Sequence, residues 1–187
     1  MKKATWTATA LLGIVGACLS LAACGGGSPA SALSPSSTAS AQILPVANNP
    51  IHNNASAPGL TISSAAVENN VDPATEKAIA DCLQLEVKNN SNQVMNSFEI
   101  YYRMQDAKTG ASEGYYQKLA GLVINPGGAS TIYFDNKNGA GHFPENRYSI
   151  YRTSQNEVSF TIELSAPGFK PAQAQATKGQ GTGEQQD

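Results

Sequence analysis

Histidine, cysteine and paired carboxylates are the side chains that most often carry catalysis or bind metals, and this chain offers few of them in useful spacings. It has two histidines: His52 lies among Ser, Ala, Pro and Asn residues, and His142 lies in a glycine-rich loop. No histidine stands at the spacing from a cysteine or an aspartate that a metal site needs. The chain also lacks a Gly-x-Ser-x-Gly nucleophile elbow and a phosphate-binding loop. We therefore predict that the protein is not an enzyme and has no catalytic residue, metal site or cofactor.

One cysteine stands in a conspicuous place: Cys24 ends an apolar run and directly precedes three glycines, residues 25–27. Residues 1–23 have the three parts of an export signal, namely Lys2 and Lys3, a short apolar stretch and two small alanines at the end. The apolar stretch is interrupted by threonines and is shorter than the roughly 20 residues of a membrane-spanning helix. We predict a cleaved signal peptide over residues 1–23, with an uncleaved anchor as the alternative.

The four residues Leu21-Ala22-Ala23-Cys24 resemble the lipobox of bacterial lipoprotein precursors at every position. The resemblance implies that a diacylglyceryl group is attached to Cys24, that cleavage occurs before it, and that the new amino terminus can receive a further acyl chain such as palmitate. One acyl chain binds a membrane only marginally, whereas two or three make the attachment effectively permanent. By the sorting rules of such lipoproteins, Gly25 implies the outer membrane of a two-membrane bacterium, on its periplasmic or surface leaflet. An ordinary signal with a chance cysteine is the alternative.

The charge of the chain excludes one large class of partners. The chain carries 12 Lys and Arg against 14 Asp and Glu, and removal of Lys2 and Lys3 with the signal leaves a net charge of −4. No basic run is present, so we predict no nucleic acid partner. Cys82 is then the last thiol without lipid, which leaves no intrachain disulfide. We interpret Cys82 as a buried small hydrophobe, with a reactive or intermolecular thiol as the alternative.

Composition divides the rest of the chain into three parts. Residues 24–59 are rich in Ser, Ala, Pro, Gly and Asn without apolar periodicity, which predicts a flexible linker that spans roughly 30–35 Å. Residues 60–170 have the length of one domain with a single core. Residues 171–187 are polar and rich in Gln and Gly, which predicts a disordered tail. A short helix or turn is expected in VDPATEKAIADC, residues 71–82, with a poorly ordered lead-in as the alternative.

Within residues 60–170 the dominant pattern is alternation of apolar and polar residues, which is typical of strands with one buried face. The alternation is clearest in residues 157–165, and a further strand is expected in RYSIYRT, residues 147–153. Turn residues such as the Asn-Pro-Gly-Gly at 125–128 separate the runs. The residues expected to face the core are Leu83, Leu85, Val87, Phe98, Ile100, Tyr102, Met104, Leu119, Leu122, Ile124, Ile132, Phe134, Tyr148, Val158, Phe160, Ile162 and Leu164.

Several such strands separated by turns predict an all-β protein with a single immunoglobulin-like antiparallel β-sandwich. The order of LEVKNNSN, FEIYYRM, NPGGASTIYF and NRYSIY resembles that of bacterial immunoglobulin-like and fibronectin-like domains. This resemblance implies a corner tyrosine at Tyr148. The first three segments are also similar to segments of cellulose-binding modules, which implies sugar binding. The chain lacks a Cys-Trp-Cys framework, since its single tryptophan, Trp6, lies in the signal.

The distribution of tyrosine offers candidates for binding, because all seven lie between Tyr101 and Tyr151. Strand parity predicts that Tyr101, Tyr133 and Tyr151 face outward, with Arg103 beside Tyr101. Outward rings can stack on sugars or anchor a protein partner, and they can equally cover a sheet by cross-strand packing. The glycine-rich loop that contains His142 is another candidate contact surface.

These features predict a non-catalytic, lipid-anchored cell-envelope protein whose β-sandwich binds another protein or supports an envelope assembly. The alternative is a carbohydrate-binding module that uses the outward tyrosines. The expected partners are therefore the membrane, through Cys24, and an envelope protein or a glycan.

Overall fold

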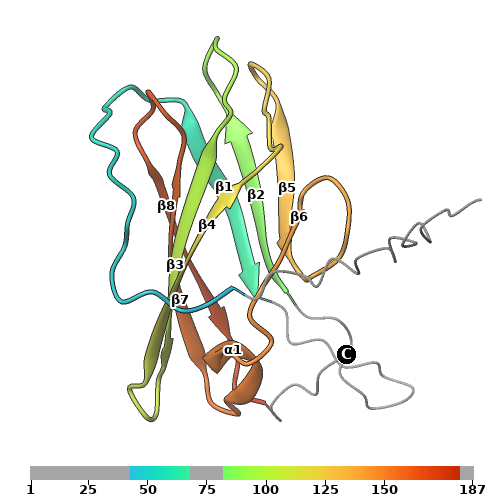
Figure 1. Ribbon diagram of the computed structural model, residues 1–187. Helices are drawn as coiled ribbons and strands as arrows, with labels where there is room; N and C mark the ends of the chain where they lie inside the picture. Colours follow the sequence, from blue (N-terminus) through green and yellow to red (C-terminus); the bar gives the residue numbers. More distant parts are fainter. Residues whose placement is uncertain (1–42, 68–81, 182–187) are drawn as a thin grey trace, which may run out of the picture. The chain divides into compact units, whose positions relative to one another are not determined.

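Strands dominate the part of the chain that the computed structural model describes, residues 43–67 and 82–181 (Figure 1). Cys24 and its signal lie outside these residues, as does the expected helix at 71–82 except for Cys82, which is buried as predicted. No helix within the described ranges is long and apolar enough to cross a membrane. The elements are β1 (Leu60–Val67), β2 (Leu83–Asn89), β3 (Phe98–Asp106), β4 (Ser112–Leu119), β5 (Ala129–Phe134), β6 (His142–Phe143), α1 (Ile150–Thr153), β7 (Val158–Ser165) and β8 (Ala172–Lys178).

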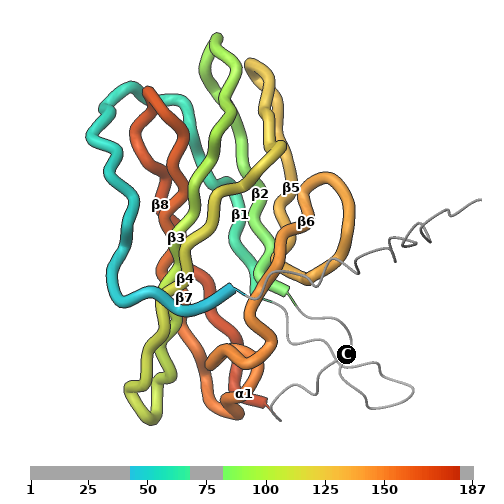
Figure 2. The backbone as a smooth tube through the Cα atoms, in the orientation of Figure 1, coloured from blue at the N-terminus to red at the C-terminus, as the bar shows by residue number. Residues whose placement is uncertain are grey.

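The strands form two four-stranded sheets, ordered β1-β2-β5-β6 and β4-β3-β7-β8. Neighbouring strands are antiparallel, except that β6 pairs with β5 in parallel. β1, β2 and β5 take the places of strands A, B and E of an immunoglobulin-like sandwich, β3, β7 and β8 those of C, F and G, and β4 that of C′. β1 and β8 belong to different sheets and contact each other, and the course of both strands can be followed in Figure 2. The prediction of a single immunoglobulin-like β-sandwich is confirmed.

The core lies between the inner faces of the two sheets, and every residue expected to face it is buried except Tyr148, which is 66 % exposed. Alternation places these side chains inward because successive residues of a strand point to opposite faces. Tyr102 of β3 joins the two sheets: its ring centroid lies 5.6 Å from that of Phe134 in β5 and 5.5 Å from that of Tyr115 in β4. Burial of one such side chain contributes roughly 1.5–3 kcal/mol.

The segment before β1 is not the flexible linker that its composition predicts. Residues 43–59, which we call the strap, run along the sandwich as the cyan segment of Figure 1. Ile51 of the strap is buried, and the Asn53 side-chain amide donates hydrogen bonds to Ser165 Oγ and to two backbone carbonyls, at 2.8–3.0 Å. Near the end of the strap, the Lys170 amide donates to the Ala57 carbonyl at 2.8 Å. An asparagine that satisfies backbone groups far along the chain leaves no periodic signal, so the prediction fails there.

The prediction of a disordered tail over residues 171–187 is also wrong at its start, because residues 172–178 form the strand β8. Their sequence AQAQATK alternates, with Ala172, Ala176 and Lys178 buried and the glutamines exposed. Alanine and glutamine have weak strand propensity, so composition pointed to disorder where tertiary packing makes a strand. Small alanines suit this place, since β8 lies both beside β7 and against β1. The sequence of β1, LTISSAAV, likewise has no regular alternation that would predict a strand.

Residues 147–153 form a turn and the four-residue α1 rather than the expected strand. The Asn146 side-chain carbonyl accepts a hydrogen bond from the Tyr148 amide at 2.9 Å, a local turn that competes with extended backbone. Ile150 and Tyr151 of α1 then turn into the core together. α1 lies at the lower end of the sandwich in Figure 1.

Candidate functional site

The five candidate binding residues do not form one site. Tyr101 and Arg103 lie on the outer face of the β4-β3-β7-β8 sheet. Tyr133 alternates with the buried Ile132 and Phe134 of β5, so it lies on the outer face of the other sheet, beside His142. The ring of Tyr151 is buried. The three tyrosines therefore provide no common platform.

Tyr151 corrects the parity prediction, since its residue is only 2 % exposed. Its ring meets the ring of Phe160 edge-on, with centroids 5.7 Å apart, and the Arg152 guanidinium lies 5.1 Å from its centroid. The predictions for Tyr148 are wrong in the opposite sense: this residue is 66 % exposed, so it lies outside the core and is not a corner tyrosine. Both errors have one cause, because the alternation of a strand does not apply to the turn and helix that these residues form.

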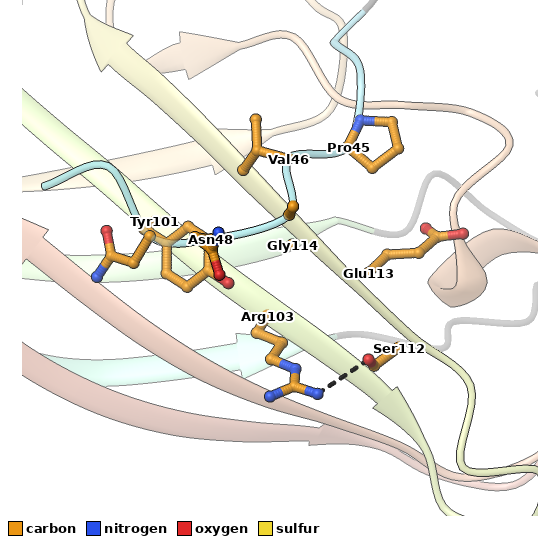
Figure 3. Close-up of a pocket in the computed structure, with 10 residues that line it drawn as sticks. Pro45, Val46, Asn48, Tyr101, Arg103, Ser112, Glu113 and Gly114 are labelled. Atoms are coloured by element: carbon orange, nitrogen blue, oxygen red, sulfur yellow. Dashed lines mark hydrogen bonds between the residues drawn. The ribbon is translucent and has the colours of Figure 1, made fainter.

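Tyr101 and Arg103 line a groove of about 510 Å³ (Figure 3). One wall is the strap, and the floor and the other wall are the outer face of β3 and β4. We call this cavity the Tyr101–Arg103 groove. The lining residues are Pro45, Val46, Ala47, Asn48, Asn49, Tyr101, Arg103, Ser112, Glu113 and Gly114.

Gly114 shapes the floor of the groove. A Cβ atom at this position would lie 2.6 Å from the Tyr101 hydroxyl oxygen and 3.0 Å from the ring carbon Cε2, so the missing side chain is what lets the ring lie over β4. The Gly114 carbonyl also accepts a hydrogen bond from the Val46 amide at 2.7 Å. This bond fixes the strap beside β4 and thereby holds the groove wall in place.

Among the described residues, Arg103 is the only cation that lines the groove. Its Nη2 donates to Ser112 Oγ at 3.0 Å, and the register places the uncharged Gly114 and Thr161 opposite it on the neighbouring strands. In the part of the chain that the structure describes, no carboxylate oxygen lies within the 4.0 Å of an ion pair with Arg103. Among these residues the guanidinium has no ion-pair partner.

Glu113, the one carboxylate of the groove lining, is directed elsewhere. Its Oε2 accepts hydrogen bonds from the Tyr115 hydroxyl at 2.6 Å and from the Ile150 amide at 3.0 Å. Figure 3 shows this carboxylate pointing away from Arg103, consistent with its bond to the first residue of α1. Glu113 thus fastens α1 to β4 and forms no ion pair with Arg103.

Tyr133 and His142 form a second, separate cluster. Their rings stack with centroids 5.0 Å apart, and His142 Nδ1 lies 2.9 Å from Asp135 Oδ2. The Asp135 side chain is 4 % exposed, and the backbone at Gly141 packs so closely that a Cβ atom there would lie 2.7 Å from the Thr131 carbonyl oxygen. These contacts hold the loop between β5 and β6 against the sheet, so the cluster is a packing arrangement.

A third cluster, which the sequence did not single out, lies under α1. Glu145 and Arg152 form a buried ion pair, and burial raises the pKa of Glu145 to about 7 although the guanidinium opposes the shift. Burial also raises the pKa of Tyr102 and of Tyr115 well above the usual range, so both phenols remain neutral. The Asn146 amide donates to the Tyr115 hydroxyl at 3.1 Å. This network is enclosed in the protein and serves to attach residues 144–153.

The groove has parts that parity alone does not reveal. Alternation places Tyr101 and Arg103 outward, but the strap wall comes from residues 45–49, more than fifty positions earlier. Ser112 and Gly114 are also lining residues whose sequence context carries no signal. Within residues 43–67 and 82–181, no three His, Cys, Asp or Glu side chains gather as metal ligands would.

No protein-family model matches the chain, and no curated protein is similar to it in sequence.

Proposed function

We propose that this protein is a non-catalytic, lipid-anchored cell-envelope protein whose β-sandwich binds another envelope protein or supports an envelope assembly. The observation that carries the proposal is the four-residue match to a lipobox at Leu21–Cys24, after a segment with the composition of an export signal. Attachment of two or three acyl chains at Cys24 would keep the domain at the membrane. The residue after the cysteine, Gly25, favours the outer membrane in a bacterium that has two.

The outer face of the β4-β3-β7-β8 sheet supports a role in binding a protein. Its exposed side chains are mostly uncharged hydrogen-bonding groups, which can pair with a partner's polar groups without the cost of removing a charge from water. Thr161 lies near the middle of this face, because β7 is an inner strand of the sheet. The exposed residues of β7 and β8 on this face are Ser159, Thr161, Gln173, Gln175 and Thr177.

A site-specific cross-linking experiment in the producing cells tests the proposal. A photo-reactive amino acid replaces Thr161 on the outer face, and the same amino acid replaces the exposed Lys137 in the loop after β5 as the control. We expect one discrete cross-linked product with an envelope protein from position 161 and none from position 137. Equal products from both positions, or none from either, would count against a partner on this face.

Mass spectrometry of the purified protein tests the anchor separately. We expect the mature chain to begin at Cys24 and to carry the mass of a diacylglyceryl group and a further acyl chain. A chain that begins at Met1, or an unmodified thiol at Cys24, would refute the anchor.

A further inference from the structure

The Tyr101–Arg103 groove has a chemical character that the rest of the outer face lacks. A single guanidinium without an ion-pair partner lies beside a half-buried tyrosine ring and amide side chains of the strap. Opposite charges directly across two strands stabilise a sheet, yet the residues directly opposite Arg103 are Gly114 and Thr161. A guanidinium of this kind can hold a planar carboxylate with two parallel hydrogen bonds.

The remaining lining groups select for a ligand rich in hydroxyl groups. Asn48 and Asn49 belong to the strap, and the Asn49 side-chain carbonyl is occupied by the Ile51 amide at 2.9 Å, which leaves its NH₂ group as a donor. Amides can both donate to and accept from hydroxyl groups. Tyr101 contributes apolar ring surface with a polar tip, as is common where sugars are bound. Figure 3 draws Asn48, Tyr101 and Arg103 among the residues that line the groove.

We propose that the Tyr101–Arg103 groove binds a saccharide that carries a carboxylate, such as a uronic acid, with Arg103 holding the carboxylate and the strap asparagines contacting the hydroxyl groups. The volume of about 510 Å³ lies in the range of small-molecule sites. One positive charge matches a carboxylate, whereas a phosphate is usually held by several donors and charges. An acidic peptide also carries carboxylates, but it offers few hydroxyl groups to the amide wall.

Sugar binding in the groove requires neither the lipid anchor nor a protein on the outer face, so its success or failure is separate from theirs. The direct measurement is titration calorimetry of the full protein, purified from whichever cell fraction contains it, with a trimer of galacturonic acid. The matched ligand is the same trimer with its carboxylates methyl-esterified, which keeps every ring and hydroxyl group and removes the charge. We expect binding of the acid trimer and a dissociation constant at least about tenfold higher for the ester, because an interaction with a charged group is lost.

Two substitutions of Arg103 and one substitution of Lys118 locate the site. Arg103→Gln should raise the dissociation constant for the acid trimer about tenfold or more. The dissociation constant of Arg103→Lys should lie between those of the unchanged protein and Arg103→Gln, because lysine keeps the charge but not the planar fork. Lys118→Gln is the matched control, since Lys118 is an exposed residue of β4 on the same outer face and does not line the groove. It should bind the trimer like the unchanged protein. Arg103 is exposed, so its variants should keep the thermal unfolding midpoint.

Three results would overturn the proposal. The first is an acid trimer that fails to bind at millimolar concentration or binds no better than its ester. The second is an equal loss of affinity in Arg103→Gln and Lys118→Gln, which would indicate attraction to overall charge. The third is an oligo-glutamate peptide, inorganic phosphate or vesicles of anionic lipid that bind at Arg103 more tightly than the trimer, which would assign the groove to another anion.

Discussion

Glu145 and Arg152 show how individual residues hold the end of the sandwich together. Their side chains are 6 % and 12 % exposed, so both charges have left bulk water and depend on each other. Removal of a carboxylate from water favours its neutral form, and here this effect outweighs the attraction of the guanidinium. The charges that act on Glu145 are those of Arg152, Asp135 and Arg147.

The raised pKa makes a prediction about stability and pH. The folded protein holds the Glu145 proton up to about pH 7, whereas the unfolded chain releases it near the ordinary value of 4.5. Between these values the folded state binds more protons, so this residue's contribution to the free energy of unfolding is greatest below pH 4.5 and falls as the pH rises to 7, by up to about 3 kcal/mol. Urea unfolding at several pH values across this window measures it.

The control for this prediction is Glu145→Gln, which cannot titrate. Both histidines are present in both proteins, so their effects cancel in the difference between the two stability curves. Relative to the variant, the unchanged protein should lose stability as the pH rises. Parallel curves would show that Glu145 keeps an ordinary pKa in the folded state.

Asn53 has a comparable role in the strap. Its side-chain NH₂ group reaches Ser165 Oγ and the carbonyls of Ala166 and Phe169, and its side-chain carbonyl accepts from the Ala55 amide at 2.9 Å. Removal of these groups leaves part-buried backbone groups without their partner.

Asn53→Ala should therefore lower the free energy of unfolding by about 1–3 kcal/mol, as measured by urea denaturation. The neighbouring Asn54→Ala is the matched control, because the Asn54 side chain is exposed and the change should stay within about 0.5 kcal/mol. Equal effects of the two substitutions would mean that the strap does not depend on Asn53.

At the scale of whole elements, the strap protects an edge of the sandwich. β4 ends its sheet, and an edge strand presents unpaired backbone groups that invite pairing with another chain. The bond from the Val46 amide to the Gly114 carbonyl occupies one of these groups. The other end of the same sheet, β8, is covered in another way, since it packs against β1.

Truncation tests the importance of β8. A chain that stops after Pro171 lacks the strand and the buried Ala172, Ala176 and Lys178; it leaves the edge of β7 unpaired and uncovers β1. We expect this chain to lose cooperative thermal unfolding. A chain that stops after Gly181 keeps every contact the structure describes and should unfold like the full protein. A cooperative transition after the shorter truncation would restore the prediction of a dispensable tail.

Residue pattern alone could predict the elements whose two faces differ strongly. β2, β3 and β7 alternate apolar and polar residues, and the buried sides are those expected from parity. β1 was less visible because a register shift between Ile62 and Ser64 interrupts its alternation, and β8 because its inward alanines are small. α1 could not be predicted because four residues cannot show a helical period. Only part of the groove could be predicted from the sequence. Parity placed Tyr101 and Arg103 outward, whereas the strap wall depends on contacts between distant residues.

At the scale of the whole molecule, the proposed anchor sits at one end of the chain and the sandwich lies beyond residues 25–42. Fully extended, these residues would reach at most about 65 Å. The strap is already part of the folded domain, so less chain separates Cys24 from the sandwich than the expected linker of residues 24–59 provides.

Membrane fractionation tests the anchor at this scale. Cys24→Ser should move the protein from the membrane fraction to the soluble fraction, because it removes the thiol to which the lipid would be attached. Cys82→Ser is the control: this thiol is buried in the sandwich, and the variant should remain with the membrane. Retention of Cys24→Ser at the membrane would point to an uncleaved anchor instead.

The order of contacts along the strap has a mechanical consequence for a tethered domain. Tension that enters from the amino-terminal side reaches the packed Ile43 and the single backbone bond from Val46 to β4 before it reaches Asn53. A moderate pull would therefore peel away the wall beside Arg103 while the two sheets stay intact. If the domain is anchored as proposed, stretching of the envelope should open the Tyr101–Arg103 groove before the domain unfolds.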